Sequence, residues 1–108
     1  MAPFSIHSAA EHDLRSIASF ISKDNRPAAA RWVAELRERF RAIGLNPGLG
    51  HRFSDDRRAS RYRVHVYGRY LIFYEPESSP VLILAVIHGM RSPETIRKLL
   101  NSRRSDSI

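Results

Sequence analysis

Arginine and histidine are the side chains with functional chemistry that stand out in this 108-residue chain. The sequence contains no cysteine, so it has neither a thiolate nucleophile nor a zinc site of the usual thiolate type. All of its 18 cationic residues except Lys23 and Lys98 are arginines. A guanidinium is a planar, two-pronged hydrogen-bond donor that suits phosphate and carboxylate groups. With a net charge of +7, the chain is expected to bind an acidic partner, whether a nucleic acid, an acidic protein segment or an anionic lipid surface.

Four of the arginines are candidate binding residues. Arg61, Arg63 and Arg69 fall on two adjacent predicted strands, so their side chains would form one patch if the strand register allows it. A solvated strand face is the alternative interpretation of these three. Arg91 follows the last predicted strand, where its guanidinium could hold the last helix, an acidic partner segment or a target.

The histidines predict no metal site, since they lack the close spacing of metal ligands: His7, His12, His51, His65 and His88. No cofactor is expected either. His88 closes a buried strand, where a packed, hydrogen-bonded side chain is the simpler interpretation and a catalytic group is the alternative.

The N-terminal half predicts a short strand and two antiparallel helices. Phe4 and Ile6 alternate with polar residues up to Ser8, which begins a helix in a capping box with Glu11. The second helix is expected to begin at Pro27 and to end at Gly44 in a left-handed conformation. The apolar stripes at helical spacing are Leu14, Ile17, Ala18 and Ile21, then Ala29, Val33, Leu36, Phe40 and Ile43.

The C-terminal half predicts a three-stranded antiparallel meander. An exposed link that includes Ser54–Arg58 leads into strands at Arg61–Tyr67, Arg69–Tyr74 and Val81–His88, with a tight reversal at Gly68. The last strand is apolar on both sides, so it is expected inside the sheet, with helices on one face and another element on the other.

A short final helix is expected to begin near Pro93, with its apolar edge at Ile96, Leu99 and Leu100 and a polar tail from Asn101 to Ile108. The length supports a single α+β domain over residues 1–108, ordered from about residue 3 to about residue 100. The apolar run Val81–Ile87 is far shorter than the roughly 20 residues of a membrane helix. Met1–His7 lacks the features of a secretory signal, which favours the cytoplasm.

The order of these motifs resembles the ParE branch of the RelE/ParE toxin superfamily, from Phe4 to about Leu100. The helical part of the resemblance consists of Asp13-Leu14 with Ile17 and Ile21, Ala29-Ala30 with Val33, Leu36 and Phe40, and Asn46-Pro47 with Gly50. The strand part consists of Tyr62-Arg63-Val64, Gly68 to Tyr74, and Val86 to Arg91 with its His-Gly-x-Arg ending. Ser92 departs from the pattern, because many relatives carry an acidic residue there.

This resemblance implies a β-α-α-β-β-β-(α) fold in which a helical hairpin packs on a mainly antiparallel sheet. It also implies the toxin of a type II toxin-antitoxin, or plasmid stabilisation, system that inhibits DNA gyrase by binding. An acidic ParD-like antitoxin would neutralise it in a hetero-oligomer, with neither a membrane nor sequence-specific DNA involved. The expected target-binding residues are Arg61, Arg63, Arg69 and Arg91. The expected antitoxin-binding residues are Trp32, Leu36, Phe40 and Arg91; Trp32 lies off the main stripe of its helix, so it could be exposed or packed at the helix edge.

Two other functions stay open. A RelE-type, metal-independent, ribosome-dependent mRNA endonuclease would need a base, an acid and cations around the phosphate. Its candidate residues are His88, Arg91, Arg69 and Arg63, although the central lysines and the late tyrosine or histidine of such enzymes are missing here. The acid and the base would therefore have to come from His65, His88 or Glu75. The third function is a non-toxic, basic nucleic-acid-binding module. Binding without catalysis is favoured, and the question of enzymatic activity stays open.

Overall fold

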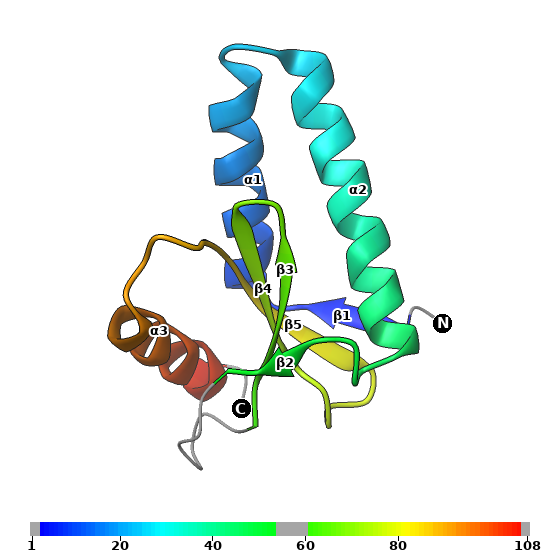
Figure 1. The fold of residues 1–108 in the computed structure, drawn as a ribbon, viewed down its shortest axis with the longest axis vertical. Coiled ribbons are helices and arrows are strands. Elements are labelled where there is room, and N and C mark those ends of the chain that lie inside the picture. Colours follow the sequence, from blue (N-terminus) through cyan, green and yellow to red (C-terminus); the bar gives the residue numbers. More distant parts are fainter. Residues whose placement is uncertain (1–2, 54–60, 107–108) are drawn as a thin grey trace.

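The computed structural model describes residues 3–53 and 61–106 and has an α+β fold (Figure 1). The predicted link at Ser54–Arg58 lies outside these residues. The elements in chain order are β1 (Phe4–Ile6), α1 (Ser8–Ser22), α2 (Arg26–Leu45), β2 (His51–Arg52), β3 (Arg63–Tyr67), β4 (Tyr70–Glu75), β5 (Val81–His88) and α3 (Pro93–Asp106).

The helical hairpin forms as predicted, but its caps differ. The predicted N-cap Ser8 is the first helical residue, and the cap is His7, whose Nδ1 accepts a hydrogen bond from the Ala9 N–H at 3.0 Å. The backbone N–H of His7, directly after β1, donates to the carbonyl oxygen of Ile83 on β5, so the helix begins directly after the strand. In α2 the side chain of Asn25 caps the helix, and Pro27 lies in the first turn.

Gly44 does not end α2 in a left-handed conformation. It lies inside the helix, which continues to Leu45, and the positive-φ glycine of the described ranges is Gly68 in the β3–β4 turn. A Cβ atom added at Gly44 would lie 2.5 Å from the carbonyl oxygen of Pro3. The glycine therefore permits close approach of the chain that leads into β1.

The sheet has the order β1-β5-β4-β3-β2, with β1 parallel to β5 and the other pairs antiparallel. The predicted meander β3-β4-β5 is confirmed, and β2 is a two-residue strand that the sequence pattern did not indicate. Between β4 and β5 the register shifts, so that Phe73 pairs with Ala85 and Tyr74 with Ile83, which leaves Leu84 without a partner on β4.

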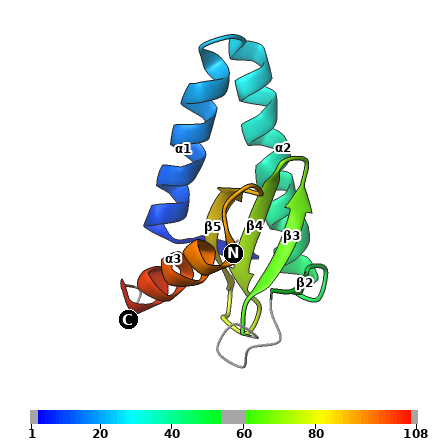
Figure 2. The same ribbon diagram turned by 60° about the vertical axis from the view of Figure 1, so that its left-hand side comes forward.

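The sheet is covered on both faces, which confirms the prediction for β5. One core cluster joins the hairpin to the sheet and includes Leu14, Leu36 and Phe40. The other joins α3 to the opposite face and includes Ile96 and Leu100. The far end of the α1–α2 hairpin projects beyond the sheet, whereas α3 lies across the lower part of the molecule (Figures 1 and 2).

The expected tail from Asn101 is wrong, because α3 continues to Asp106. Arg103 and Arg104 fix this last part of the helix through ion pairs with Asp13 on α1 and Glu75 on β4. Within residues 3–53 and 61–106, no helix is both long and apolar enough to cross a membrane.

Candidate functional site

The predicted patch of Arg61, Arg63 and Arg69 does not form. Arg63 pairs with Tyr74 at the start of β3, whereas Arg69 lies in the turn at the other end of the β3–β4 hairpin. At about 3.3 Å per residue, β3 alone separates the two ends by roughly 13 Å. Arg61 precedes β3 and lies on the Arg63 side.

Arg63 has a structural contact instead. Its Nη1 donates to the carbonyl oxygen of Gly50 at 2.6 Å, and the Gly50 N–H donates to the hydroxyl of Tyr74 at 2.8 Å. The same hydroxyl donates to the carbonyl oxygen of Pro47 at 2.7 Å. Arg63 and Tyr74 thus hold the segment that enters β2.

Arg69, His88 and Arg91 come together at the opposite end of the sheet. The Gly89 N–H donates to the carbonyl oxygen of Arg69 at 2.9 Å, and Tyr70 pairs with His88 across β4 and β5. Three of the four residues proposed for an RNase are therefore neighbours, and Arg63 is not among them.

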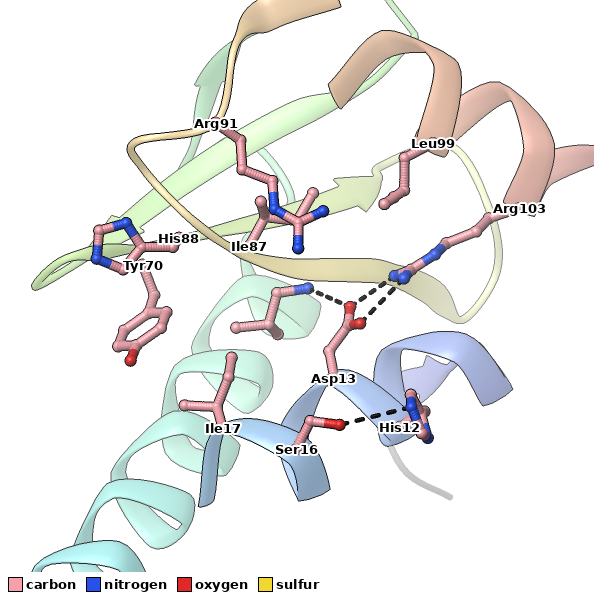
Figure 3. Close-up of a pocket in the computed structure, with 11 residues that line it drawn as sticks. His12, Asp13, Ser16, Ile17, Tyr70, Ile87, His88, Arg91, Leu99 and Arg103 are labelled. Carbon is pink, nitrogen blue, oxygen red and sulfur yellow. Dashed lines mark hydrogen bonds and ion pairs between the residues drawn. The ribbon is translucent and has the colours of Figure 1, made fainter. Parts of the chain in front are cut away.

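A cleft of about 340 Å³ opens beside this end of the sheet, between α1, β5 and α3 (Figure 3). Its polar lining includes His12, Asp13, Ser16, His88, Arg91 and Arg103. Ile17 and Leu99 contribute apolar walls.

Asp13 and Arg103 form the central contact of the cleft. Arg103 donates from Nη1 and Nη2 to the two carboxylate oxygens of Asp13 at 2.6 and 3.0 Å. The Arg103 side chain is 13% exposed and that of Asp13 is 16% exposed, so the pair is largely shielded from water. The Val86 N–H donates to Asp13 at 3.0 Å, and Arg103 Nη1 donates to the carbonyl oxygen of Leu84 at 2.8 Å.

These contacts provide hydrogen-bond partners for two backbone groups of β5, the Val86 N–H and the Leu84 carbonyl oxygen. β1 covers β5 only from Val81 to Ile83, and the register shift removes Leu84 from the ladder with β4. Unpaired backbone groups at a largely buried position destabilise a fold. The side chains of Asp13 and Arg103 take the place of the missing strand and tie α1, β5 and α3 together.

Arg91 lines the same cleft without such a contact. Its side chain is exposed, and Figure 3 shows the guanidinium directed into the cleft. Among the residues that the structure describes, none forms a hydrogen bond or ion pair with this guanidinium. Its backbone N–H donates to the carbonyl oxygen of His88 at 3.2 Å.

His88 is exposed but held in place. Its Nδ1 accepts a hydrogen bond from the Met90 N–H at 3.1 Å, so in the neutral ring the proton is on Nε2. The ring lies edge-on to Tyr70, with centroids 5.6 Å apart, and Tyr70 contacts Trp32 in the same manner at 5.3 Å. The hydrogen bond and ring contact fit the structural interpretation of His88.

Two of the four predicted antitoxin-binding residues lie in the core. Leu36 and Phe40 are 0% exposed, so neither side chain forms part of the surface of this structure. Their helical stripe is used for the core between α2 and the sheet. Trp32 is half-buried against Tyr70, as expected for packing at the helix edge.

The other polar groups give little support for catalysis or metal binding at the cleft. The Oγ of Ser16 and the Nε2 of His12 are 3.5 Å apart and exposed, which is a long contact between neighbours on one helix face. In the described part of the chain, no group of three His, Cys, Asp or Glu side chains could hold a metal. His65 lies away from the cleft: burial, with Arg39 and His51 nearby, lowers its pKa, and its Nε2 is buried without a partner in the described residues.

Asp13 and Arg103 are the site residues that sequence reasoning missed as a pair. A signal for Arg103 existed, since it follows Ile96, Leu99 and Leu100 by seven, four and three residues and continues their helical stripe. Asp13 directly precedes Leu14 of the first stripe. Nothing in either segment indicated the partner.

Comparison with known proteins bears on both halves of the chain. No curated protein matches it. A family model described as "ParE toxin of type II toxin-antitoxin system, parDE" matches residues 4–93, which include the helical hairpin, the whole sheet and Arg91. The chain therefore belongs to the ParE toxin family of type II toxin-antitoxin systems.

Proposed function

We propose that this toxin acts by binding and inhibiting DNA gyrase in the cytoplasm, and that an acidic ParD-like antitoxin neutralises it. Family membership supports the toxin role and the existence of an antitoxin partner. The observation that supports the binding mechanism is the guanidinium of Arg91, which lines the cleft and has no hydrogen-bond or ion-pair partner in residues 3–53 and 61–106. Arginine is enriched among the residues that dominate protein interfaces, and a net charge of +7 favours an acidic partner.

A RelE-type RNase is the second candidate, because Arg69, His88 and Arg91 meet at one end of the sheet. The geometry supports it less well. General acid–base cleavage needs two positioned proton-transfer groups near the phosphate. His88 has one ring nitrogen engaged with Met90, and Arg63 is bound to Gly50 at the far end of the hairpin.

Gyrase supercoiling with the purified chain tests the proposal. We expect the chain to inhibit supercoiling and Arg91→Gln to reduce inhibition at least tenfold. Arg41→Gln removes the same charge from an exposed position on α2 and should inhibit like the parent. Unimpaired supercoiling at saturating chain would reject the gyrase target, and codon-phased cuts in translated messages after induction would identify an RNase.

The antitoxin is tested by co-expression with the product of the adjacent open reading frame. A stable complex on size-exclusion chromatography, and supercoiling restored by that product, are the expected results. If the two proteins elute separately, the proposed pairing is wrong. Tight binding of DNA or RNA by the chain alone would instead favour a nucleic-acid-binding module.

A further inference from the structure

Among the described residues, Arg91 has no ion-pair partner, and the carboxylate that lines its cleft, that of Asp13, is already occupied. Asp13 accepts two hydrogen bonds from Arg103 and one from the Val86 N–H. Two guanidiniums and one carboxylate line the cleft, so the described part of the chain leaves one positive charge there without a fixed counter-charge. Such a cleft favours one incoming anionic group.

The surroundings of Arg91 indicate which anionic group suits it. The cleft, at about 340 Å³, is at the lower end of the roughly 300–1,000 Å³ of ligand pockets, and Ile17, Ile87 and Leu99 line part of it. A nucleic-acid backbone is bound by several cations spaced along its phosphates. A single guanidinium beside apolar walls and a fixed carboxylate suits one planar carboxylate better.

An exposed apolar side chain lies on the same face of α1. Phe20 is 68% exposed and follows Ile17 and Ser16, which line the cleft, by three and four residues. Residues at these spacings are neighbours along a helix face. A protein segment that reaches the cleft along α1 would therefore also cover Phe20, which lies in the last turn of α1. That end of the helix leads away from the sheet (Figure 2).

We propose that the cleft binds one glutamate or aspartate carboxylate of an acidic protein segment, with Arg91 as its two-pronged donor and Phe20 as an adjoining apolar contact. The inference rests on the proposed function only in assuming that the toxin has a protein partner. It names the chemical group that Arg91 recognises. It also assigns Phe20, which no motif singled out, to the binding surface.

The test is an NMR titration of the isotope-labelled chain, made by cell-free synthesis. The probes are the capped tripeptide acetyl-Leu-Glu-Leu-amide, its Gln counterpart and inorganic phosphate. We expect the Glu peptide to shift the Arg91 Nε–Hε and Phe20 ring signals saturably and to bind at least tenfold more tightly than the Gln peptide. Arg91→Gln should abolish this preference, and Arg41→Gln should retain it.

Substitutions at Phe20 and Arg91 separate the two contacts. Phe20→Ser should weaken both peptides about equally, and Arg91→Lys should lose most of the preference for Glu because it keeps the charge without the planar fork. Equal binding of both peptides, or a tighter response of Arg91 to phosphate than to the Glu peptide, would overturn the proposal. The titration contains neither gyrase nor an antitoxin. If the Glu peptide binds as expected but the chain does not inhibit gyrase in the supercoiling assay, only the proposed gyrase target is rejected.

Discussion

The contact between Asp13 and Arg103 should contribute a large part of the stability of this small domain. Arg103→Met keeps most of the apolar stem and removes the two donors to Asp13 and the donor to Leu84. Removing one partner of a fully buried ion pair costs about 3–5 kcal/mol. Because the two side chains are 13% and 16% exposed, water can replace part of the loss. We therefore expect a decrease of about 2–4 kcal/mol in the free energy of unfolding.

Urea unfolding of the single and double variants measures this contribution. For a domain of this size, the expected loss corresponds to a decrease in Tm of roughly 10 to 25 °C. Asp13→Asn should destabilise the chain by a similar amount, and the double variant should lose about 2 kcal/mol less than the sum of the single losses. Lys98→Met removes one charge from an exposed position on the same helix and should change stability by no more than about 0.5 kcal/mol.

Two results would refute this reasoning. If Arg103→Met is as stable as Lys98→Met, the observed hydrogen bonds do not stabilise the fold. If the losses from Asp13→Asn and Arg103→Met are simply additive, each side chain acts independently and the contact between them is not the cause.

Two further predictions concern packing and pH. Gly44→Ala should lower the free energy of unfolding by about 1–3 kcal/mol in urea unfolding, despite its better helix propensity, because the new Cβ would lie 2.5 Å from the carbonyl oxygen of Pro3. Gly48→Ala, whose nearest atom would be 3.7 Å away, is the control and should be close to neutral. Burial lowers the pKa of His65 in the folded chain, so as the pH falls below about 6.5 the unfolded chain binds a proton at His65 more readily than the folded chain does. The contribution of neutral His65 to stability is therefore present above about pH 6.5 and is lost as the pH falls below that value. His65→Gln should therefore lose less stability than the parent between pH 7.5 and 5.5 in the same assay, and equal losses would contradict this assignment.

The order of the elements was predictable because it depends on local patterns. Helical stripes, strand alternation and the turn at Gly68 located the hairpin and the meander, and the two-sided apolar run placed β5 inside the sheet. The parallel pairing of β1 with β5 and the two residues of β2 depend on tertiary contacts that leave no periodic signal. Gly44 was misassigned because close approach to Pro3 and a helix end both require glycine.

In the candidate site, the sequence predicted only the location of residues whose place follows from their position relative to a strand. Arg91 does lie shortly after the end of β5, as its place in the sequence indicated. The grouping of Arg63 with Arg69 failed because a hairpin pairs residues at equal distances from its turn. Gly68 and Arg69 are the two turn residues, so Arg63, five residues before Gly68, pairs with Tyr74, five residues after Arg69. The position of the predicted turn was therefore sufficient to place Arg63 and Arg69 at opposite ends of the hairpin.

The contacts that complete the sheet edge also determine which arginine of the cleft has no partner among the residues that the structure describes. Asp13 on α1 lies in one cleft with Arg91, which follows β5, and Arg103 on α3 (Figure 3). The contact with Arg103 is favoured because the same guanidinium also satisfies the carbonyl oxygen of Leu84, which has lost its place in the β-ladder. Asp13 and Arg103 therefore bind each other because this arrangement also satisfies the backbone of β5. Because Asp13 is already satisfied, the guanidinium of Arg91 has no hydrogen-bond partner among the described residues, and its donors are available for the carboxylate that we propose.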